Sequence, residues 1–503
     1  MQPFPFDNTY VRSLPDFYVP WKPASAAAPQ LVFFNDALAA ELGLDASALS
    51  GPDGAALFAG NTLPQGAEPI AQAYAGHQFG GFSPRLGDGR ALLLGEVVDR
   101  AGRRRDLAFK GSGRTPFSRG GDGKAALGPM LREVLMGEAM HALGIPTTRA
   151  LAVAATGESV YREQALPGAV LTRVAASHLR VGTFQFGLAG GDLDKLRQLA
   201  EYAIARHNPE LVGTPDRHLA VLRAVAGRQA TLIAQWMNVG FIHGVMNTDN
   251  MAISGETIDY GPCAFMENYD PAAVFSSIDH ADRYAYGNQP GIARWNLARF
   301  AETLLPLMAP GDGEAAAQRA VGQALEVIDA FPLWYATALR QGQRAKLGLY
   351  ADSAADDSAD SALAYDWLAL LHAQTVDFTL AWRRLADAAE GNVAALSGLF
   401  AKPDALSGWL ERWHARCALD EAAGGPAGAQ RATRMRSASP WIIPRNHRVE
   451  EALAAASVDN NLAPFEGLLA ALRRPYDESP ELAYYAEPAA ADVTARYQTF
   501  CGT

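Results

Sequence analysis

Residues 243–261, HGVMNTDNMAISGETIDYG, contain a turn, short apolar runs and polar side chains that together indicate how this chain folds. The runs at 251–253 and 257–258 flank Ser254-Gly255, which is typical of a two-residue hairpin turn. In such a hairpin Asn250 and Asp259 face each other, roughly 5 Å apart. An amide oxygen and a carboxylate at that spacing suit a hard cation, and Asp249 adds a second carboxylate. The alternative is a surface hairpin with polar ends.

The composition argues against several classes of protein. A chain of 503 residues, 49% of them hydrophobic, can bury a large core and should divide into two or three domains. The net charge of -11 disfavours nucleic-acid binding. There is no apolar run of about 18 residues, no targeting segment and no dense cysteine pattern. We therefore expect a cytoplasmic protein that binds neither nucleic acid nor a membrane.

Two predicted strands and a helix place a lysine beside a glutamate. Residues 91–98 and 105–110 read as paired strands joined by a turn at Ala101-Gly102, so that Lys110 ends the second strand. Residues 127–143 have helical periodicity and include Glu133. We expect Glu133 to reach Lys110 and fix its ammonium group against a phosphate. The alternative is a solvated helix charge.

Two glycine-rich stretches, 76–99 and 110–124, lie on either side of the second of these strands. Glycine leaves backbone N–H groups free to cradle anionic oxygens, although a flexible surface loop has the same composition. Residues 169–183 are predicted as a helix on which Arg173 and Arg180, seven residues apart, share one face. Two such arginines can grip a polyphosphate, or they can be exposed and salt-bridged.

The rest of the chain is predicted to be mainly helical. Residues 1–60 read as an irregular extension with one helix near 35–44, and strands are expected at 150–154 and 159–163. Helices are expected at 193–206, 216–238, 292–306, 314–345 and 361–389. Residues 352–361 form an acidic link, and 420–439 read as a loop. Strands followed by helices predict an α+β fold with two lobes.

The order of these parts matches that in protein kinases. His243 and Asn250 are seven residues apart, as in the kinase catalytic loop, and Asp259-Tyr260-Gly261 takes the place of Asp-Phe-Gly. The catalytic aspartate of that loop is replaced by Val245, so the usual general base is missing. This comparison predicts either a pseudokinase or a kinase-like enzyme with altered chemistry.

Long strings of the sequence resemble the selenoprotein O family (SelO, called YdiU in bacteria), which are kinase-like protein adenylyltransferases. The resemblance covers nearly the whole chain and is carried by FDNTYVRSLP (6–15), QAYAGHQFGGFSPRLGDGRA (72–91), LAFKGSGRTPFSRGGDGKAALGPMLREVLMGEAMHALGIPTTRAL (107–151) and HGVMNTDNMAISGETIDYGPCAFME (243–267). It implies a bilobal protein-kinase-like fold with a strand-rich N-lobe, a helical C-lobe and a helical C-terminal extension. The expected divisions are 1–60 (N-terminal extension), 61–170 (N-lobe), 171–350 (C-lobe) and 351–503 (C-terminal region).

The resemblance also implies the reaction and its residues. ATP would bind flipped relative to ordinary kinases, and AMP would pass to Ser, Thr or Tyr hydroxyl groups of protein substrates. Asp249 would accept the proton, Asn250 and Asp259 would bind Mg²⁺ or Mn²⁺, and Glu133 would support Lys110. The ATP-binding residues would be Gly87, Gly89, Arg90, Lys110, Asp122, Gly123, Arg173, Arg180 and Asp259. Cys501 occupies the position near the C-terminus where relatives carry selenocysteine or cysteine.

Three alternatives remain beside adenylylation. Close relatives imply UMP transfer from UTP, whereas Val245 favours a catalytically inactive nucleotide-binding scaffold. Small-molecule phosphotransferases share the His-Gly start of the loop, but they need the aspartate that is replaced here by Val245. Retention of Lys110, Glu133 and the 249–259 polar residues argues against the scaffold.

Overall fold

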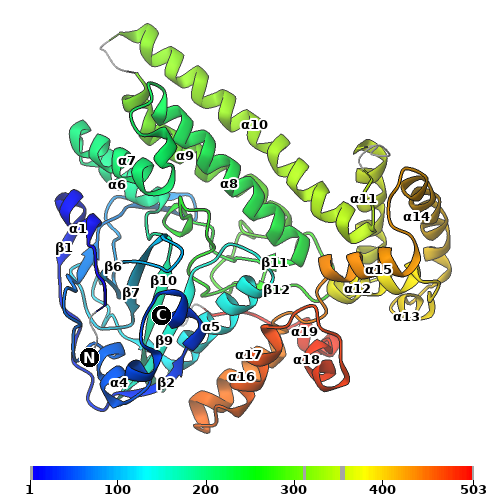
Figure 1. Cartoon of the computed structure of the whole chain (residues 1–503), viewed down its shortest axis with the longest axis horizontal. Coiled ribbons are helices and arrows are strands. Elements are labelled where there is room, and N and C mark those ends of the chain that lie inside the picture. The colour runs from blue at the N-terminus through cyan, green and yellow to red at the C-terminus, as the bar shows by residue number, and fades with distance from the viewer. Residues whose placement is uncertain (1–3, 310–312, 352–356, 501–503) are drawn as a thin grey trace.

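An eight-stranded antiparallel sheet forms the strand-rich part of the protein. The computed structural model describes residues 4–309, 313–351 and 357–500 (Figure 1). Along the sheet the order is β1-β3-β6-β7-β10-β9-β2, and β8 pairs with β10. The strands are β1 (Tyr18–Pro20), β2 (Gln30–Phe34), β3 (Ile70–Gln72), β6 (Ala91–Val98), β7 (Arg104–Lys110), β8 (Ala125–Ala126), β9 (Arg149–Tyr161) and β10 (Ala165–Ala175).

The N-terminal residues are part of this sheet, and the prediction of an irregular extension is wrong. Strands β1 and β2 close its two edges, β1 against β3 and β2 against β9. Short helices surround them: α1 (Thr9–Ser13), α2 (Asp36–Glu41), α3 (Ala46–Leu49) and α4 (Pro52–Phe58). Leu31 and Phe34 of β2 pack into a core with Leu57 and Phe58 of α4. Both edges therefore depend on partners distant in sequence, which a local pattern does not reveal.

Helix α5 (Leu127–Ala142) is buried on nearly all sides, as its apolar composition requires. It packs against β9 and β10 on one side and against α16 (Asn446–Val458) and α17 (Ala463–Leu472) on the other. Leu131, Val134 and Leu135 have no exposed surface. This double cover fixes the position of Glu133 on the same helix.

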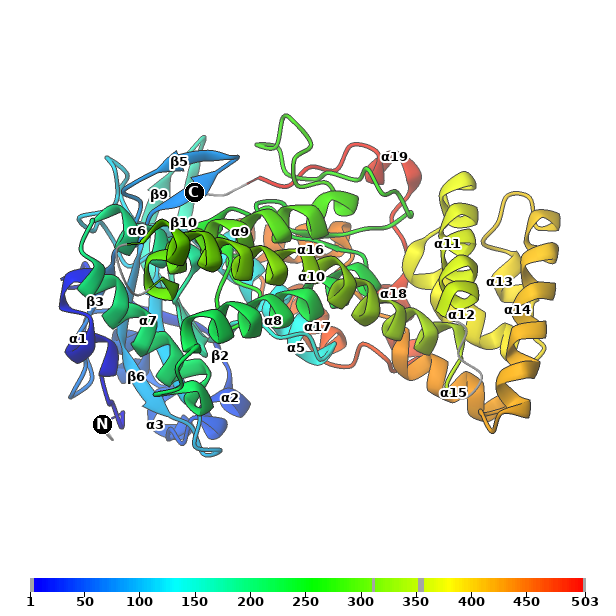
Figure 2. The ribbon, with the colours of Figure 1, turned by 90° about the horizontal axis from the view of Figure 1, so that it is seen from above.

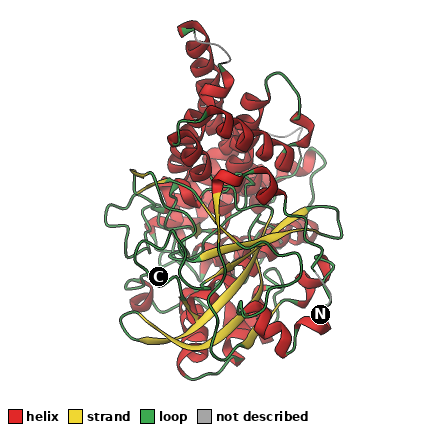
Figure 3. Ribbon diagram, turned by 90° about the vertical axis from the view of Figure 1, so that its left-hand side faces the viewer, coloured by secondary structure: helices red, strands yellow, loops and turns green. Residues whose placement is uncertain are grey.

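The helical part contains two groups of helices, and Figure 3 shows the strands gathered at one end of the molecule with most helices at the other. In the first group α8, α9 and α10 pack on one another, with α6 and α7 beside them (Figure 2). Its helices are α6 (Val181–Ala189), α7 (Leu193–His207), α8 (Arg217–Val239), α9 (Gln289–Met308) and α10 (Glu314–Leu347). The second group is built around buried Trp367, Trp382, Trp409 and Trp413. It comprises α11 (Asp357–Ala373), α12 (Phe378–Ala389), α13 (Ala394–Ser397), α14 (Asp404–Ala422) and α15 (Gly428–Ala438), and α18 (Ala483–Ala486) and α19 (Ala491–Thr494) follow later in the chain.

Most long elements were predicted, and four were not. Residues 169–183 form the end of β10 and the start of α6 rather than one helix. The two strands expected at 150–154 and 159–163 are one strand, β9. The helix expected at 361–389 is broken before α12, where the Asp377 side chain accepts a hydrogen bond from the Leu380 N–H. The loop expected at 420–439 contains helix α15. The mixture of a strand-rich sheet and a helical remainder confirms the α+β arrangement.

Three further observations concern a membrane span, the cysteines and the acidic link. Among the described residues, no helix combines the length and apolarity needed to cross a membrane. Cys263 is buried, which raises the pKa of its thiol to about 12. Cys501 and the first half of the acidic link (352–356) lie outside the described residues.

Candidate active site

Asp259 lies at the centre of a cluster of three cations. Its Oδ1 atom is 2.7 Å from Lys110 Nζ and 2.6 Å from Arg173 Nη1, and its Oδ2 atom is 2.8 Å from Arg180 Nη1. Burial by itself raises the pKa of Asp259, but the three cations outweigh it and hold that pKa well below the ordinary value. Asp259 is therefore a fixed anion around which the rest of the site is arranged.

The sheet register brings two of these cations together. Lys110 ends β7 opposite Leu171 of β10, and Arg173 lies opposite Ala108. Residues that pair directly in an antiparallel sheet, and residues two apart on one strand, project from the same face. Lys110 and Arg173 thus converge from adjacent strands. Arg180 arrives separately as the residue that precedes α6, so the two arginines meet without sharing a helix.

The predicted contact between Lys110 and Glu133 is confirmed. The Lys110 ammonium group forms an ion pair with the Glu133 carboxylate, and both side chains are only 6% exposed. Glu133 comes from α5, whose position is set by the sheet and the C-terminal helices. In direct contact, three cations surround two carboxylates. The cluster therefore has a surplus positive charge, which a phosphate can neutralise.

Asp249 reaches this cluster through Arg180, and Asn250 follows it in the chain. The Arg180 Nη1 group donates to the Asp249 backbone oxygen at 2.7 Å as well as to Asp259. Asp249 and Asn250 lie in the short 3₁₀ helix η3 (Thr248–Asn250), and the Asn250 amide donates to the Val245 carbonyl at 3.0 Å. Val245 itself is buried and offers no polar side chain.

The predicted strand pairing within 251–258 is wrong. The Gly255 N–H donates to the Ala252 carbonyl, so the turn exists. However, the two runs do not pair with each other. Ala252 forms an isolated β-bridge with Arg180, and Thr257 forms one with Thr147. The apolar runs find partners elsewhere because those segments offer free backbone groups in the buried interior. Asn250 follows Asp249, whose backbone oxygen shares Arg180 with Asp259, and no hairpin register sets Asn250 opposite Asp259 in the described structure.

The Asp249 carboxylate is buried with one unused oxygen. Oδ2 accepts a hydrogen bond from Gln78 Nε2 at 3.3 Å, whereas Oδ1 has no hydrogen-bond partner among the described residues. Burial raises the pKa of Asp249 to about 6. A Cβ atom at Gly76 would lie 2.6 Å from this Oδ1, and one at Gly182 would lie 3.3 Å from the Asp249 Cα. Two glycines therefore let the backbone close around a carboxylate that is able to take a proton or a cation.

A divalent cation would find oxygen donors here. The Asp249 carboxylate, the Asn250 amide and the Asp259 carboxylate are the hard donors that Mg²⁺ and Mn²⁺ prefer. The unpartnered Asp249 Oδ1 is the structural sign that a further group fits. The described part of the chain contains no group of three or more His, Cys, Asp or Glu side chains that could hold a metal ion. A metal site here would therefore need the Asn250 amide as well as the carboxylates.

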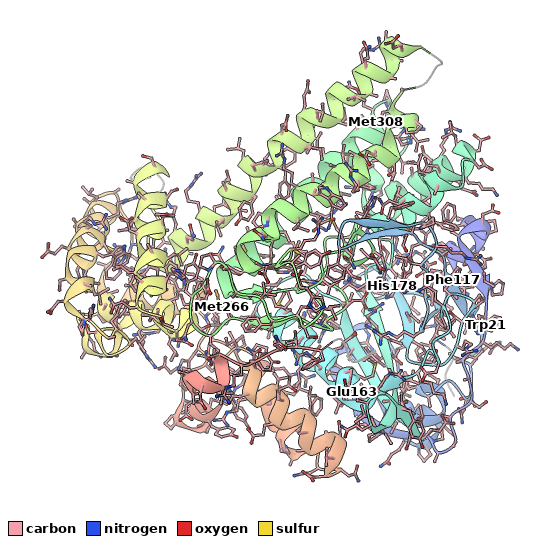
Figure 4. The ribbon with its side chains drawn as sticks, turned by 180° about the vertical axis from the view of Figure 1, so that it is seen from behind. Trp21, Phe117, Glu163, His178, Met266 and Met308 are labelled. Atoms are coloured by element: carbon pink, nitrogen blue, oxygen red, sulfur yellow. The ribbon has the colours of Figure 1, made fainter. Side chains whose placement is uncertain are left out.

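The two glycine-rich loops are tied to each other beside Lys110. Thr115 Oγ1 donates to the Asp88 carbonyl at 2.5 Å, Ser118 Oγ donates to the Gly89 carbonyl, and the Gly111 N–H donates to the Arg90 carbonyl at 2.7 Å. Gly87 is required because it has φ +77° and packs against the Phe117 ring, 2.4 Å from where its Cβ would lie. Figure 4 labels Phe117 within the strand-rich part of the molecule.

Asp122 and Gly123 lie at the outer end of this assembly. Gly123 has φ +66°, and a Cβ atom there would meet the Gly113 carbonyl at 2.1 Å. Asp122 pairs with Arg162 at 2.9 Å, and its carboxylate is 42% exposed. The structure thus joins six of the predicted residues through direct contacts and places Gly87, Gly89 and Arg90 in the adjoining loop. Asp122 and Gly123 form the rim. The six are Lys110, Glu133, Arg173, Arg180, Asp249 and Asp259; Asn250 follows Asp249 in the chain, and its amide contacts Val245.

Three side chains of the site were missed by the sequence reasoning. The Arg180 guanidinium stacks over the Tyr74 ring at 4.8 Å, and Gln78 contacts Asp249. His178 Nε2 accepts a hydrogen bond from Arg173 Nε at 3.2 Å. Tyr74 and Gln78 stand within the glycine-rich string at 72–91, which was a usable signal, whereas nothing in the sequence distinguishes His178.

Comparisons with known proteins agree over nearly the whole length of the chain. The model of a family described as "Protein adenylyltransferase SelO" matches residues 3–473. A protein of Chromobacterium violaceum named "Protein nucleotidyltransferase YdiU" is 60% identical over 490 residues, 97% of this chain and all of its own. Proteins of the same name from Cereibacter sphaeroides and Rhizobium meliloti are 58% and 56% identical, over 99% and 100% of this chain and all of their own.

Proposed function

Because this chain belongs to the SelO family of protein adenylyltransferases and is a nucleotidyltransferase, we propose that it transfers AMP from ATP to Ser, Thr or Tyr hydroxyl groups of protein substrates. One observation carries the proposal. A surplus of positive charge around Asp259 adjoins, through Arg180, the buried and unpartnered Oδ1 of Asp249. A triphosphate and a proton acceptor can therefore be held side by side.

The cations would bind the triphosphate. Lys110, kept in place by Glu133, and Arg173 and Arg180 would contact phosphate oxygens and stabilise charge on the transferring group and on pyrophosphate. Gly87, Gly89 and Arg90 would line the nucleotide, with Asp122 and Gly123 at its outer end. Asn250 and Asp259, with their oxygen donors, would hold Mg²⁺ or Mn²⁺, which supplies further neutralisation of phosphate charge when bound.

Asp249 would orient and deprotonate the acceptor. In the reaction the acceptor oxygen forms a bond to the α-phosphorus while the bond from that phosphorus to the bridging oxygen breaks. The hydroxyl proton passes to Asp249, and pyrophosphate leaves with the electron pair of the broken bond. The position of Asp249 supports this role, since it is the carboxylate beside Arg180 that has no cation of its own. Val245 shows why the ordinary kinase position cannot serve.

We also propose that the sheet with α5 and the helices from α6 onward correspond to the two lobes of a kinase-like fold. Lysine at the end of a strand, glutamate on the next helix and a metal-binding loop among the helices support that correspondence. The likeness to kinases lies in the parts and their order along the chain. Arg173 and Arg180, which meet at Asp259, differ from the kinase arrangement and would suit a nucleotide bound in the opposite direction.

The test is transfer from labelled ATP. The purified protein is incubated with Mg²⁺ and ATP labelled at the α- or the γ-phosphate, and intact mass identifies the group added to protein. Label from the α-position is expected, with loss of transfer in Asp249→Ala. Label from the γ-position alone would instead indicate an ordinary kinase, and tight ATP binding without transfer would indicate a scaffold. The same assay with UTP and Mn²⁺ measures nucleotide preference.

A further inference from the structure

A surface of aromatic rings and arginines adjoins the loop that carries Asp249. It comprises Phe79, Phe82, Arg283, Trp295 and Arg299, and we call it the acceptor platform. Phe79 and Phe82 are 41% and 48% exposed, although large apolar side chains are usually covered. They project from a small hairpin formed by β4 (Gly76–Gln78) and β5 (Gly81–Ser83).

The hairpin is fastened to the loop that carries Asp249. The His77 N–H donates to Thr248 Oγ1 at 2.7 Å, and the Phe79 N–H donates to Asn247 Oδ1 at 3.0 Å. Gln78, between them, contacts Asp249 itself. Neighbouring Cα atoms are about 3.8 Å apart, so a peptide that places a hydroxyl group at Asp249, the proposed proton acceptor, can reach Phe79 with a side chain only a few residues away.

Arginines and Trp295 complete the platform beside the hairpin. The guanidinium groups of Arg283 and Arg299 lie 5.0 and 5.1 Å from the Trp295 ring, which also makes an edge contact with His77 at 5.2 Å. A Cβ atom at Gly80 would be 3.7 Å from the Arg283 guanidinium carbon, so Arg283 abuts the hairpin tip. Rings on which guanidinium groups stack hold those groups in a fixed orientation.

The charges of the platform favour an acidic ligand. Arg299 is paired with Glu302 at 2.7 Å, but no carboxylate pairs with Arg283 within the described residues. The carboxylate of nearby Asp279 is taken up by the backbone N–H groups of Arg283 and Tyr284, at 3.0 and 2.7 Å. Arg283 is held in one orientation, has no carboxylate partner in the described structure and lies next to exposed rings. It is therefore suited to bind an Asp or Glu side chain of a ligand peptide in which the neighbouring residue is apolar.

We propose that the acceptor platform binds the segment of the substrate protein that carries the hydroxyl group, through an acidic side chain at Arg283 and an apolar one on Phe79 and Phe82. This inference rests on the proposed AMP transfer to proteins. The platform makes the enzyme selective for hydroxyl groups in acidic, apolar surroundings. Its ligand is a protein segment rather than a nucleic acid, because the chain carries a net charge of -11.

The inference is tested with two synthetic peptides that differ only beside one serine, Glu-Phe in the first and Lys-Phe in the second. The full-length protein, ATP and Mg²⁺ are used, and AMP transfer is followed by mass. We expect kcat/KM at least tenfold higher for the Glu peptide. Arg283→Glu should abolish or reverse that preference. Arg319→Glu, the same charge reversal at an exposed position of α10, should keep it.

Controls separate the possible failures. Phe82→Ala, an exposed substitution that the fold tolerates, should raise KM for both peptides several-fold and leave kcat unchanged. AMP transfer to both peptides at equal rates would overturn the platform while leaving the proposed function standing, whereas no AMP transfer to any acceptor would overturn the proposed function. Inhibition by a single-stranded oligonucleotide that Arg283→Glu relieves would assign the surface to nucleic acid and overturn the inference.

Discussion

Two of the buried charge clusters in the described part of the chain, around Asp259 and around Arg445, have similar contacts and opposite character. Around Asp259, three cations meet two carboxylates. Around Arg445, one guanidinium meets two carboxylates, with Nη1 2.6 Å from both Glu267 Oε2 and Asp377 Oδ2. The Asp259 side chain is 19% exposed, whereas that of Arg445 is fully buried.

The sign of the surplus charge and its access to solvent distinguish the two roles. The Asp259 cluster is positive, borders the glycine-rich loops and can gain an anionic ligand. The Arg445 cluster is sealed, and burial raises the pKa of Glu267, which favours its neutral form. Arg445 is the residue before α16. It ties that helix to Asp377, the residue before α12, and to Glu267 in the segment that follows Asp259. One cluster is therefore open to a substrate, and the other joins parts of the chain.

The largest expected effect is that of Asp259→Ala on catalysis. Removal of the carboxylate leaves three cations unbalanced and deletes a proposed metal ligand, so AMP transfer should fall at least a thousandfold, about 4 kcal/mol. Transfer from α-labelled ATP measures this. Asp459→Ala, at an exposed position, is the matched control and should retain full activity. A rate for Asp259→Ala within tenfold of wild type would show that the cluster is structural like that of Arg445.

Arg445→Met should have its effect on stability. Two buried carboxylates lose their cation, which costs about 3 kcal/mol at pH 7, as a lower urea midpoint would show. Burial already raises the pKa of Glu267, and without the guanidinium that pKa rises further above its unfolded value. The part of the loss that comes from Glu267 is therefore present above its unfolded pKa and shrinks as the pH falls toward 4. Arg448→Met, in an ion pair with exposed Glu451, should cost less than about 1 kcal/mol. Equal losses would refute the distinction.

Glu133→Gln tests whether the Lys110 pair serves the ligand. Lys110 would lose the partner that fixes it and turn further toward Asp259, so kcat/KM for ATP should fall about thirtyfold, about 2 kcal/mol. Steady-state kinetics with varied ATP measure the change. Glu158→Gln breaks the more exposed pair with Lys124 and should change the same constant less than twofold. If both variants behave alike, Glu133 has no special part in ATP use.

Lys346, a buried cation outside both clusters, gives the smallest effect. Lys346 lies 5.6 and 5.3 Å from the rings of Phe378 and Trp382, without a carboxylate partner in the described part of the chain, and burial lowers its pKa to about 7. Between pH 7 and 10.5 the unfolded state binds more protons, so wild-type stability rises with pH there. Lys346→Met should therefore stabilise the protein by about 1–2 kcal/mol at pH 7, after the lost ring contacts are deducted. Urea midpoints at pH 7 and pH 10 should show the gain disappearing.

The sequence predicted those parts of the site that follow from local order. Lys110 ends a strand and Glu133 lies on the next helix, so their contact needs only short connections. Arg173 was misplaced because the apolar run around it fits a buried strand as well as a buried helix. The runs flanking Ser254-Gly255 were predicted to pair because a turn signal says nothing about competing partners, here near Thr147 and Arg180.

The same limit applies to the fold. Strands 91–98 and 105–110 were predictable because a turn at Ala101-Gly102 joins them, whereas the edge strands are short and depend on distant partners. Helix α15 forms in a Gly- and Ala-rich segment because Met435 is buried in the tryptophan-centred core and Arg431 contacts the Asp420 carboxylate there. Tertiary contacts of this kind override composition.

The placement of β1 and β2 at the two edges of the sheet imposes an order on biosynthesis. Both strands leave the ribosome early, yet Val19 must wait for Ala71 and Leu31 must wait for Ala154. Until then the nascent N-terminus carries unpaired strands and the aromatic residues Phe33 and Phe34, which are prone to wrong association. A chaperone that holds this stretch during translation would therefore matter more for the yield of this enzyme than one that acts on the completed chain.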